Sequence, residues 1–524
     1  MLIGDIATNN ARRYPGKRAL VDADRTHSWS QVDARSSRLA DFLADSPLVP
    51  GDRVMVIARN GIEWPEISFG LAKAGLVAVP VNIRLAPDEV AHVRDDSQAR
   101  AAIIHTDQYE TFAGELDGLA VVLTIGDEYE SALAAAEPIA PQIDIAPDDV
   151  TVILYTSGTT GRAKGVMHTH RGLLYQAADT NLVTEADRSD VMLATTPFFT
   201  AGGMVRTVSW LYLGQTMVIH QRFDPQAVVD EIERSAITFT TFIPTMLQRT
   251  LAILENGPNR DMSSLRRISY GSAPVPPGLA RKAMDLLGCE LQQRYGLTEC
   301  GGQATILTPQ DHRDIVAGKA SIATSCGQET PMCSIRVVDN NGDHAPTGEV
   351  GEIVIVSPAN AIGYWNRPAQ TAETFRPDGL RTGDLGYLDD ENYLHITGRK
   401  TDMIISGGFN VYPAEIERVI AQHAGVDLVA VVGVADPEWG ETPVAVVIPN
   451  PHVSDHDALT AELTDLCRAE LAGYKQPRRF EYRDEFPLGP AGKIIKREIA
   501  NQVNQVADAG GRMPVTTGPT EEHS

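Results

Sequence analysis

The chain has 524 residues, of which 43% are hydrophobic and 22% charged, a composition that is typical of globular proteins and excludes disordered, collagen-like and coiled-coil classes. Lys and Arg number 45 against 69 Asp and Glu, and the resulting net charge of −24 disfavours nucleic acid and anionic membranes as partners. The five scattered cysteines contain no C-x-x-C pair, and no apolar run has the length of a membrane span or a leader peptide, so we expect a cytoplasmic protein without a membrane span, a disulfide framework or a thiolate zinc site.

Helices and strands alternate along most of the chain. In chain order, the patterns predict a helix over 28–43, strands over 54–58, 76–81 and 150–155, a helix over 225–233, strands over 237–242 and 267–270, and a helix over 277–287. Strands separated by helices favour parallel sheets with both faces covered. After about residue 342, short strands over 351–356, 385–388 and 393–397 with glycine turns indicate a small antiparallel part.

A second, smaller unit is predicted near the C-terminus. Its expected strands are 403–406, 428–434 and 443–448, and its expected helices are 413–422 and 457–471. Residues 504–524 carry no apolar pattern and are predicted to form a disordered tail. The sequence therefore predicts an α/β fold with parallel sheets and a small antiparallel barrel-like part, followed by a small α+β domain.

Residues 155–165 form the segment with the clearest chemistry. After a strand that ends near Tyr155, the sequence Thr156-Ser-Gly-Thr-Thr-Gly-Arg-Ala-Lys164 combines hydroxyl side chains, glycines and a lysine. Glycines let backbone N–H groups approach an anion, hydroxyls donate hydrogen bonds, and Lys164 adds a positive charge, so the loop suits phosphate. The spacing is not that of a Walker A loop, and a flexible surface loop is the alternative.

This loop and several later motifs resemble the superfamily of acyl- and aryl-CoA synthetases, adenylation domains and luciferases, with a pattern most similar to bacterial fatty-acid and aryl-acid CoA ligases. The matching segments stand in the family's order: Thr156 to Gly165, Gly271 to Pro274, Tyr295 to Glu299, Thr382 to Asp384, Gly398-Arg399, Ser406 to Gly408 with Pro413 to Glu417, and Gly492-Lys493. The resemblance implies a domain over 1–399 with the ATP, Mg²⁺ and acid sites, a hinge over 400–403, and a mobile C-terminal domain over 404–503.

The resemblance also implies which residues bind the nucleotide. The phosphates are assigned to Thr156, Ser157, Gly158, Thr159, Thr160, Gly161 and Lys164; the adenine to Tyr295 on one side and to Gly271, Ser272, Ala273 and Pro274 on the other; and the ribose to Asp384. The resemblance also assigns Gly296, Thr298, Arg399 and Lys493 to the nucleotide site. These residue types suit the roles, because an aromatic ring stacks on a base and a carboxylate accepts hydrogen bonds from ribose hydroxyls. Without the family, Asp384 is more typical of an Asx turn.

Four residues are implied to be catalytic: Thr156, Lys164, Glu299 and Lys493. Glu299 is the implied Mg²⁺ ligand, since a hard carboxylate oxygen suits this ion. Lys493 lies in a Gly-Lys segment near the C-terminus and is implied to stabilise negative charge on the reacting carboxylate and the α-phosphate. Read without the family, Lys493 is more typical of a solvated lysine.

The resemblance places the acid beside Phe199, Thr200, Ala201, Gly202, Gly203, Gly271 and Gly296. Thr200 stands where the family usually has a histidine that gates the acyl tunnel, and three small residues follow it, which suggests a wider or differently gated pocket and a bulky acid. Thr401 stands where the hinge usually has an Asp or Lys. His168 and His170 alternate along a strand without a third ligand, and we interpret them as structural rather than metal-binding.

Five residues are implied to contact the thiol substrate. The resemblance places three of them toward the thiol tunnel: Ser406, Gly407 and Gly408. In aryl-CoA ligases, aromatic residues contact the CoA nucleotide at positions similar to those of Trp439 and Tyr474. The basic residue expected near Gln476 is missing from the sequence pattern.

The sequence is therefore interpreted as an ATP-dependent carboxylic acid–CoA ligase that forms an acyl-adenylate and uses ATP, Mg²⁺ and CoA; a homodimer is compatible with it. Four alternatives remain at this stage: an enzyme that passes the acyl group to a carrier protein, an enzyme specialised for adenylation, a luciferase-like oxygenase, and a non-catalytic binding relative. The last is disfavoured because Lys164, Glu299 and Lys493 are all retained.

Overall fold

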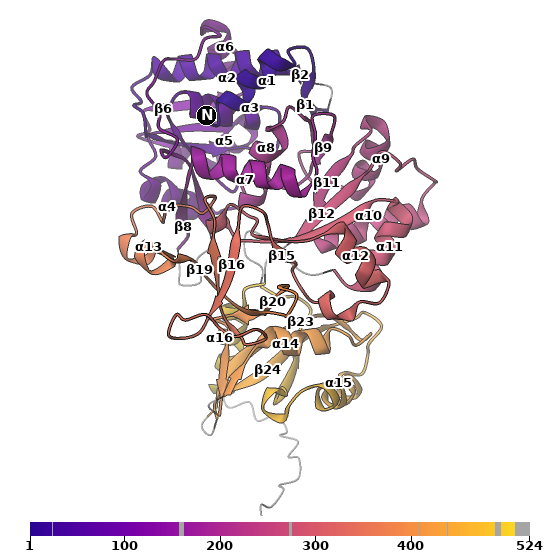
Figure 1. The fold of residues 1–524 in the computed structure, drawn as a ribbon. Helices are drawn as coiled ribbons and strands as arrows, with labels where there is room; N and C mark the ends of the chain where they lie inside the picture. Colours follow the sequence, from indigo (N-terminus) through magenta and orange to yellow (C-terminus); the bar gives the residue numbers. More distant parts are fainter. Residues whose placement is uncertain are drawn as a thin grey trace, which may run out of the picture. The chain divides into compact units, whose positions relative to one another are not determined.

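The computed structural model describes residues 1–23, 25–156, 162–271, 275–407, 409–436, 439–487 and 494–508 (Figure 1). The chain divides into two compact units, one made of residues 1–382 with 386–396 and the other of residues 383–385 with 397 onward. No helix among the described residues is long and apolar enough to cross a membrane.

A nine-stranded sheet in the first unit has the order β15-β14-β13-β12-β11-β9-β10-β1-β2. Its strands are β1 (Arg18–Asp22), β2 (Arg25–Ser28), β9 (Val191–Ala194), β10 (Thr216–Ile219), β11 (Phe239–Phe242), β12 (Arg267–Gly271), β13 (Glu290–Tyr295), β14 (Thr305–Leu307) and β15 (Gln328–Glu329). The six strands from β1 to β13 in the middle of this order are parallel, whereas β2, β14 and β15 pair antiparallel at the two edges.

A second sheet has six strands in the order β6-β5-β3-β4-β7-β8. They are β3 (Arg53–Ile57), β4 (Val77–Pro80), β5 (Ala101–His105), β6 (Val121–Ile125), β7 (Val150–Thr156) and β8 (Lys164–Thr169). All neighbours are parallel except β7 and β8, which form an antiparallel pair. This pair places the two ends of the segment 157–161 next to each other.

Helices cover these sheets, as Figure 1 shows for α9, α10 and α11 over the nine-stranded sheet. The helices of this part are α1 (Asp5–Arg13), α2 (Trp29–Ala44), α3 (Glu63–Lys73), α4 (Pro87–Ser97), α5 (Thr106–Phe112), η1 (Ala113–Leu116), α6 (Asp127–Ala135), α7 (His170–Val183), α8 (Ala201–Leu211), α9 (Pro225–Ser235), α10 (Pro244–Asn256), α11 (Pro277–Leu287), η2 (Thr298–Cys300), α12 (Pro309–Val316), η3 (Ala320–Ile322) and α13 (Pro368–Thr374). Neighbouring strand residues alternate between two cores: Val54 and Val56 face the core shared with α2, α7 and α8, and Met55 and Ile57 face the core under α4 and α5.

A five-stranded sheet follows, with the order β16-β17-β19-β18 and with β20 beside β19. Its strands are β16 (Ser334–Val338), β17 (Gly351–Val356), β18 (Phe375–Arg376), β19 (Gly379–Leu388) and β20 (Leu394–Arg399). The printed pairs β16–β17 and β18–β19 are antiparallel, and Ile335, Ile353 and Leu394 belong to its core.

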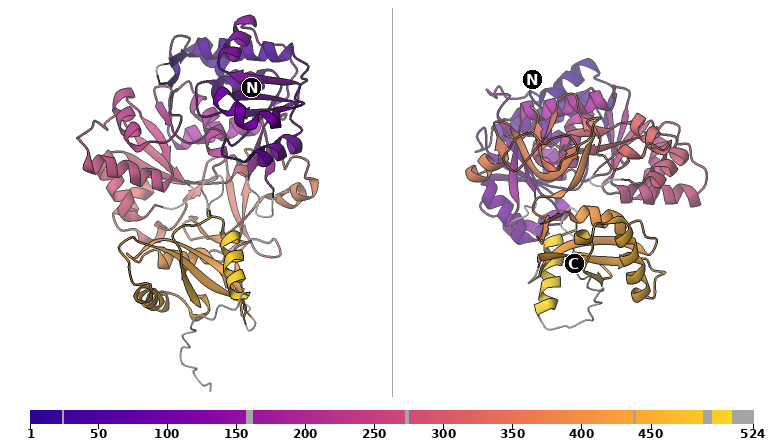
Figure 2. Two further views of the ribbon diagram at one scale, coloured as in Figure 1. Left: turned by 180° about the vertical axis from the view of Figure 1, so that it is seen from behind. Right: turned by 60° about the horizontal axis from the view of Figure 1, so that its bottom comes forward.

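The second unit contains a sheet in the order β22-β21-β24-β23, with β25 parallel to β24. Its elements are β21 (Ile404–Ser406), β22 (Phe409–Val411), α14 (Pro413–Ile420), β23 (Val426–Asp436), β24 (Gly440–Pro449), α15 (His456–Glu470), η4 (Gly473–Lys475), β25 (Arg479–Tyr482) and α16 (Lys496–Asp508). Alternate residues of β23 face α14 and α15 on one side and α16 on the other, and Figure 2 shows α16 against this sheet. The predicted fold class, parallel α/β sheets with a smaller antiparallel part and an α+β unit, is confirmed. The predicted tail 504–524 begins too early, because residues 504–508 belong to α16; the remaining residues of the predicted tail lie outside the described residues.

Candidate active site

The predicted phosphate loop joins β7 to β8. Thr156, the last residue of β7, pairs with Lys164, the first residue of β8. Ser157, Gly158, Thr159, Thr160 and Gly161 lie outside the described residues. The hairpin therefore brings the two described members of the predicted phosphate site side by side.

Lys164 and Glu299 both contact Tyr364, the lysine at the ring and the glutamate at the hydroxyl. The Lys164 Nζ lies 5.1 Å from the centroid of the Tyr364 ring, and the Tyr364 hydroxyl donates a 2.9 Å hydrogen bond to Glu299 Oε1. A cation over the face of an aromatic ring is attracted by the negative charge of that face. The structure thus joins two residues predicted to be catalytic, from β8 and η2, through a residue that the sequence analysis did not select.

Tyr364 is held in place by backbone pairing with β8. Residues 361–365 run along this strand: Met167 N donates to Gly363 O, and Trp365 N donates to Gly165 O. The same segment reaches η2, because Ala361 N donates to Glu299 O at 2.8 Å. The short motif Gly363-Tyr-Trp365 gives no chemical signal of its own, and only this pairing shows its connection to the site.

The predicted adenine residues lie at the ends of neighbouring strands. Gly271 ends β12 and pairs with Arg294 of β13, and Ser272, Ala273 and Pro274 lie outside the described residues. Tyr295 ends β13 and leads through Gly296 to Thr298 at the start of η2. An added Cβ at Gly296 would lie 2.6 Å from Gln303 N, so only glycine permits this turn. The ends of β12 and β13 thus bring Gly271, Tyr295 and η2 to one edge of the sheet.

His168 in β8 and His170 at the start of α7 are both buried among protein groups. His168 is 1% exposed, and burial lowers its pKa to about 4. His170 accepts a 3.2 Å hydrogen bond from Ile3 N at Nδ1, and burial likewise lowers its pKa to about 4. Both imidazoles are therefore neutral near pH 7.

The predicted acyl-pocket residues form the start of α8. Thr200 caps this helix: its Oγ1 accepts from Gly203 N at 3.1 Å and donates to Pro197 O at 2.8 Å. Phe199 is buried, with 9% of its surface exposed. Thr200 therefore takes the role of a helix cap. A Cβ on Gly203 would lie 2.1 Å from Pro197 O, so Gly203 is needed by the turn.

A cavity of about 20 Å³ lies between α7, α8, the end of β13 and the segment after η2. Ala201 and Gly202 line it, together with Arg206 and Arg294. A Cβ on Gly202 would lie 3.7 Å from Arg206 Nη1, so the position of Gly202 faces the Arg206 guanidinium group. The expectation that small residues create a wide pocket remains a prediction, but the described surroundings are polar and positively charged.

Asp384 and Arg399, the predicted ribose and nucleotide residues, form an ion pair of 2.8 Å between Arg399 Nε and Asp384 Oδ1. Asp384 is 5% exposed. Lys400 N donates to Gly383 O at 2.8 Å, which joins the two strands β19 and β20 at this position. Both predicted residues therefore belong to the second compact unit.

The predicted CoA residues form two neighbouring groups in the second unit. Ser406 pairs with Gly440, and Gly407 N donates to Trp439 O at 2.8 Å. Gly407 has φ +56°, and an added Cβ would lie 2.6 Å from the Trp439 ring. Tyr474 stacks on the exposed Phe409 with ring centroids 4.7 Å apart. Gly408 lies outside the described residues, as does Lys493.

Two cations accompany these aromatic rings. Arg478 lies 5.1 Å from the centroid of the Trp439 ring, and Lys475 lies 5.7 Å from that of Tyr474. Lys475 also pairs with Glu415 at 2.8 Å. The sequence pattern had no basic residue at the expected position near Gln476, whereas the structure places Arg478 against the predicted CoA-binding tryptophan.

Comparison with known proteins identifies two family models that together match most of the chain. Residues 7–365 match the family model described as AMP-binding enzyme, and residues 415–493 match the AMP-binding enzyme C-terminal domain. Feruloyl-CoA synthase of Amycolatopsis sp is 36% identical over 501 residues, which cover 95% of this chain and 98% of that protein. Fatty acid–[acyl-carrier-protein] ligase ScoC of Streptomyces coeruleorubidus is 34% identical over 502 residues, covering 94% of this chain and 95% of that protein.

A solved structure shares the fold over nearly the whole chain. o-Succinylbenzoate CoA synthetase (MenE) from Bacillus subtilis, in complex with the acyl-adenylate intermediate OSB-AMP, has a TM-score of 0.83 at 29% identity. The match covers 94% of this chain and 97% of that chain.

Proposed function

This chain belongs to the AMP-binding enzyme family, and we propose that the residues described above carry out the two half-reactions of an ATP-dependent carboxylic acid–CoA ligase. The ligase activity follows from the family and from similarity to CoA ligases over almost the full length of both proteins. In the first half-reaction a carboxylate oxygen attacks the α-phosphorus of ATP, giving acyl-adenylate and pyrophosphate. In the second, the CoA thiol attacks the acyl carbon, loses its proton, and displaces AMP.

The contact between Lys164, Tyr364 and Glu299 is the observation that carries this proposal. The ammonium group of Lys164 stands at the end of the β7–β8 hairpin, where backbone N–H groups and hydroxyls of the loop suit the phosphates. The Tyr364 hydroxyl donates a hydrogen bond to the Glu299 carboxylate, and the Tyr364 ring lies against the Lys164 ammonium group. A positive group and a carboxylate held by the same tyrosine suit a nucleoside triphosphate and its counter-ion.

Glu299 fits a magnesium ion. Mg²⁺ commonly takes one or two protein carboxylates together with substrate phosphate oxygens and water. Glu299 offers one carboxylate, and the hydrogen bond from Tyr364 fixes its Oε1. When bound, the ion would neutralise phosphate charge; the residues of this chain bind the nucleotide and orient it.

The second unit supports the thiol half-reaction. Trp439 lies under Gly407 and carries Arg478 on its ring, so an aromatic surface and a cation stand together. Aromatic rings suit a nucleobase and a guanidinium suits phosphate, and CoA contains both. We assign Ser406, Gly407, Trp439 and Tyr474 to CoA, with Arg478 as an added contact.

Lys493 is proposed to act in adenylation alone. Lys493→Ala should lower ATP–pyrophosphate exchange with a good acid by at least about a hundredfold, because a positioned cation at developing charge contributes several kcal/mol. The reaction of preformed acyl-adenylate with CoA should stay within about threefold of the unaltered enzyme. Lys282→Ala, which removes a partly exposed lysine of α11 that pairs with Glu255, is the control for loss of a lysine far along the chain from Lys493.

Near-normal pyrophosphate exchange in the Lys493 variant would contradict this role. Equal loss in both half-reactions would show that Lys493 acts on folding or on a shared step. If the acyl group passes to a carrier protein and never to CoA, the enzyme belongs to the acyl-carrier class instead.

A further inference from the structure

Two arginines share the cavity beside α8 without an acidic partner. Arg206 and Arg294 both line it, and in the part of the chain that the structure describes neither guanidinium forms an ion pair. Arg294 is 7% exposed, and its Nε and Nη2 have no hydrogen-bond partner there. Buried charges in proteins are normally paired, because an unpaired ion loses its hydration without compensation.

The nearby protein groups do not supply the missing negative charge. The charge of Asp179 opposes the lowering of the Arg294 pKa by burial, but both oxygens of this carboxylate already accept hydrogen bonds, from Gln303 Nε2 and Met332 N. The Arg294 guanidinium also lies 5.9 Å from the centroid of the Phe239 ring, which compensates its charge only partly. Burial lowers the pKa of Arg206 to about 10 and that of Arg294 to about 9, so both remain cations near pH 7.

The cavity belongs to the side of the site where the acid is proposed to lie. Ala201 and Gly202, both expected to contact the acid, line it. Gly302 and Gln303, which lie against Gly296, line it as well. A purely apolar acid would bury both guanidinium groups against hydrocarbon, whereas an acid with a negative group at this end would pair with them.

We propose that the acid carries a second carboxylate, remote from the one that reacts with ATP, and that Arg206 and Arg294 bind it. This assignment rests on the proposed ligase function and names its substrate class. Arg206 is the residue chosen for the test, because its guanidinium lies next to Gly202 in the cavity; Arg294, in β13, lines the same cavity. Dicarboxylic acids are therefore the preferred substrates, and monocarboxylic acids of the same length are poor ones.

The test compares matched pairs of acids. Aliphatic monoacids and diacids of four to ten carbons, and cinnamate with its 4-hydroxy and 4-carboxy derivatives, are assayed for pyrophosphate release with Mg·ATP and CoA. The best diacid should exceed its monoacid partner at least about tenfold in kcat/KM. Arg206→Gln should lower kcat/KM for the diacid by about thirtyfold or more and leave the monoacid within about threefold, since it removes one partner of a buried charge pair.

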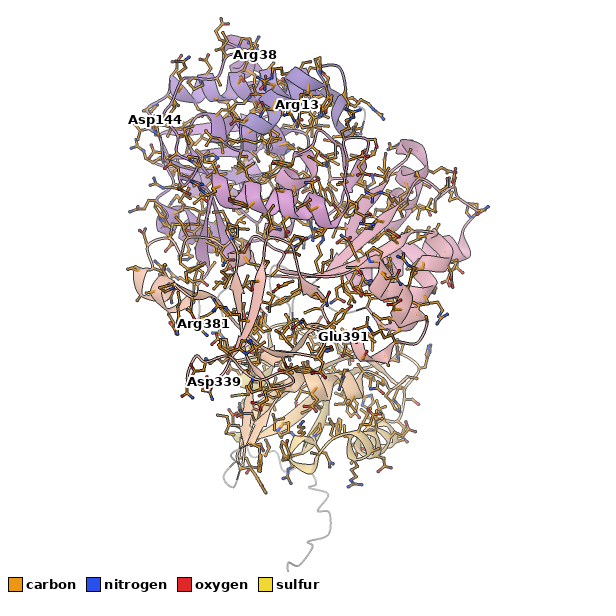
Figure 3. All side chains as sticks on the ribbon, in the orientation of Figure 1. Arg13, Arg38, Asp144, Asp339, Arg381 and Glu391 are labelled. Atoms are coloured by element: carbon orange, nitrogen blue, oxygen red, sulfur yellow. The ribbon has the colours of Figure 1, made fainter. Side chains whose placement is uncertain are left out.

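Two variants serve as controls. Arg206→Lys keeps the charge and should retain part of the preference for diacids. Arg13→Gln removes an exposed arginine on α1, outside the cavity lining, and should leave the ratio unchanged; Figure 3 labels this residue. A folding defect in the Arg206 variants would lower kcat/KM equally for the diacid and the monoacid, and it would appear in a thermal melt.

The inference is overturned if a monoacid or the hydroxy derivative serves as well as its diacid partner, or if Arg206→Gln leaves the ratio unchanged. If no acid of any class releases pyrophosphate, the proposed function fails, and ligand-induced shifts of the melting temperature then decide the inference separately. A shift with diacids that is absent with monoacids and lost in Arg206→Gln supports the arginine site. Equal shifts with both, or none, contradict it.

Discussion

Tyr364 connects Lys164 to Glu299 through two different properties of one side chain. Its ring face attracts the Lys164 ammonium group, and its hydroxyl donates to Glu299. The ring also packs edge-on against Phe375 with centroids 5.3 Å apart, which limits its rotation. Because the tyrosine is fixed by β8 on one side and Phe375 on the other, it can orient a carboxylate without being a ligand itself.

Tyr364→Phe should keep the ring and lose only the hydrogen bond to Glu299. We expect kcat/KM for ATP to fall about tenfold, the effect of losing roughly 1.5 kcal/mol from a hydrogen bond to a charged group. Half-saturation by Mg²⁺ should shift to higher concentration in the same variant. Pyrophosphate release measured across Mg²⁺ concentrations gives both quantities.

Tyr109→Phe, at an exposed tyrosine of α5, is the control for loss of a hydroxyl. If Tyr364→Phe has normal kinetics with ATP and Mg²⁺ while Tyr364→Ala is merely unstable, the tyrosine is only a packing residue. The Glu299 carboxylate would then be oriented by other contacts.

At the scale of elements, the turn before α8 shows how two neighbouring glycines differ. Gly203 lies against the backbone of Pro197 and Phe198, where an added Cβ has no space. Gly202 has only Arg206 side-chain atoms nearby, at 3.7 Å or more. Both were expected to line the acyl pocket, but only Gly202 faces the cavity.

Gly203→Ala should destabilise the protein by about 2 kcal/mol or more, because the Cβ can be accommodated only by moving the helix cap formed by Thr200. Gly202→Ala should change the free energy of unfolding by less than about 0.5 kcal/mol and alter the preference among acids instead. Urea denaturation monitored by circular dichroism measures both. Equal destabilisation of the two variants would show that the turn adjusts freely and would contradict this description.

Elements with local signals could be predicted from the sequence, and those made by distant pairing could not. Helix 277–287 was predicted with the bounds found, since Pro277 begins it, Gly288 ends it, and its apolar residues recur at helical spacing. β8 was not predicted, because Gly165 and His168 interrupt its pattern and its partners are β7 and residues 361–365. Only the last four residues of β19 were predicted, since glycines divide the rest.

The same distinction applies to the site. Ordered motifs identified Lys164, Glu299 and Asp384 by family resemblance, and the structure shows a partner for each: the Tyr364 ring for Lys164, the Tyr364 hydroxyl for Glu299, and Arg399 for Asp384. Tyr364 was missed because its contacts join segments that are far apart in the sequence. Arg206 was missed because it stands in a mainly apolar helical stretch, which was interpreted as core.

At the scale of the whole molecule, the chain has two compact units, and residues 383–385 belong to the second of them. The ion pair between Asp384 and Arg399 therefore lies within one unit, although the two residues come from different strands. The hinge over 400–403 and its unusual Thr401 remain proposals. A small, uncharged residue there would still permit rotation, because rotation depends on backbone freedom.

The most direct test of the account is the product balance with CoA present. Purified enzyme, Mg·ATP, CoA and the best acid of the panel are incubated for many turnovers, and the products are quantified by mass spectrometry. The account predicts acyl-CoA, AMP and pyrophosphate in equal amounts, with no accumulation of adenylate. A burst of about one equivalent of pyrophosphate, with acyl-adenylate retained and little acyl-CoA formed at saturating CoA, would contradict it and show an enzyme limited to adenylation.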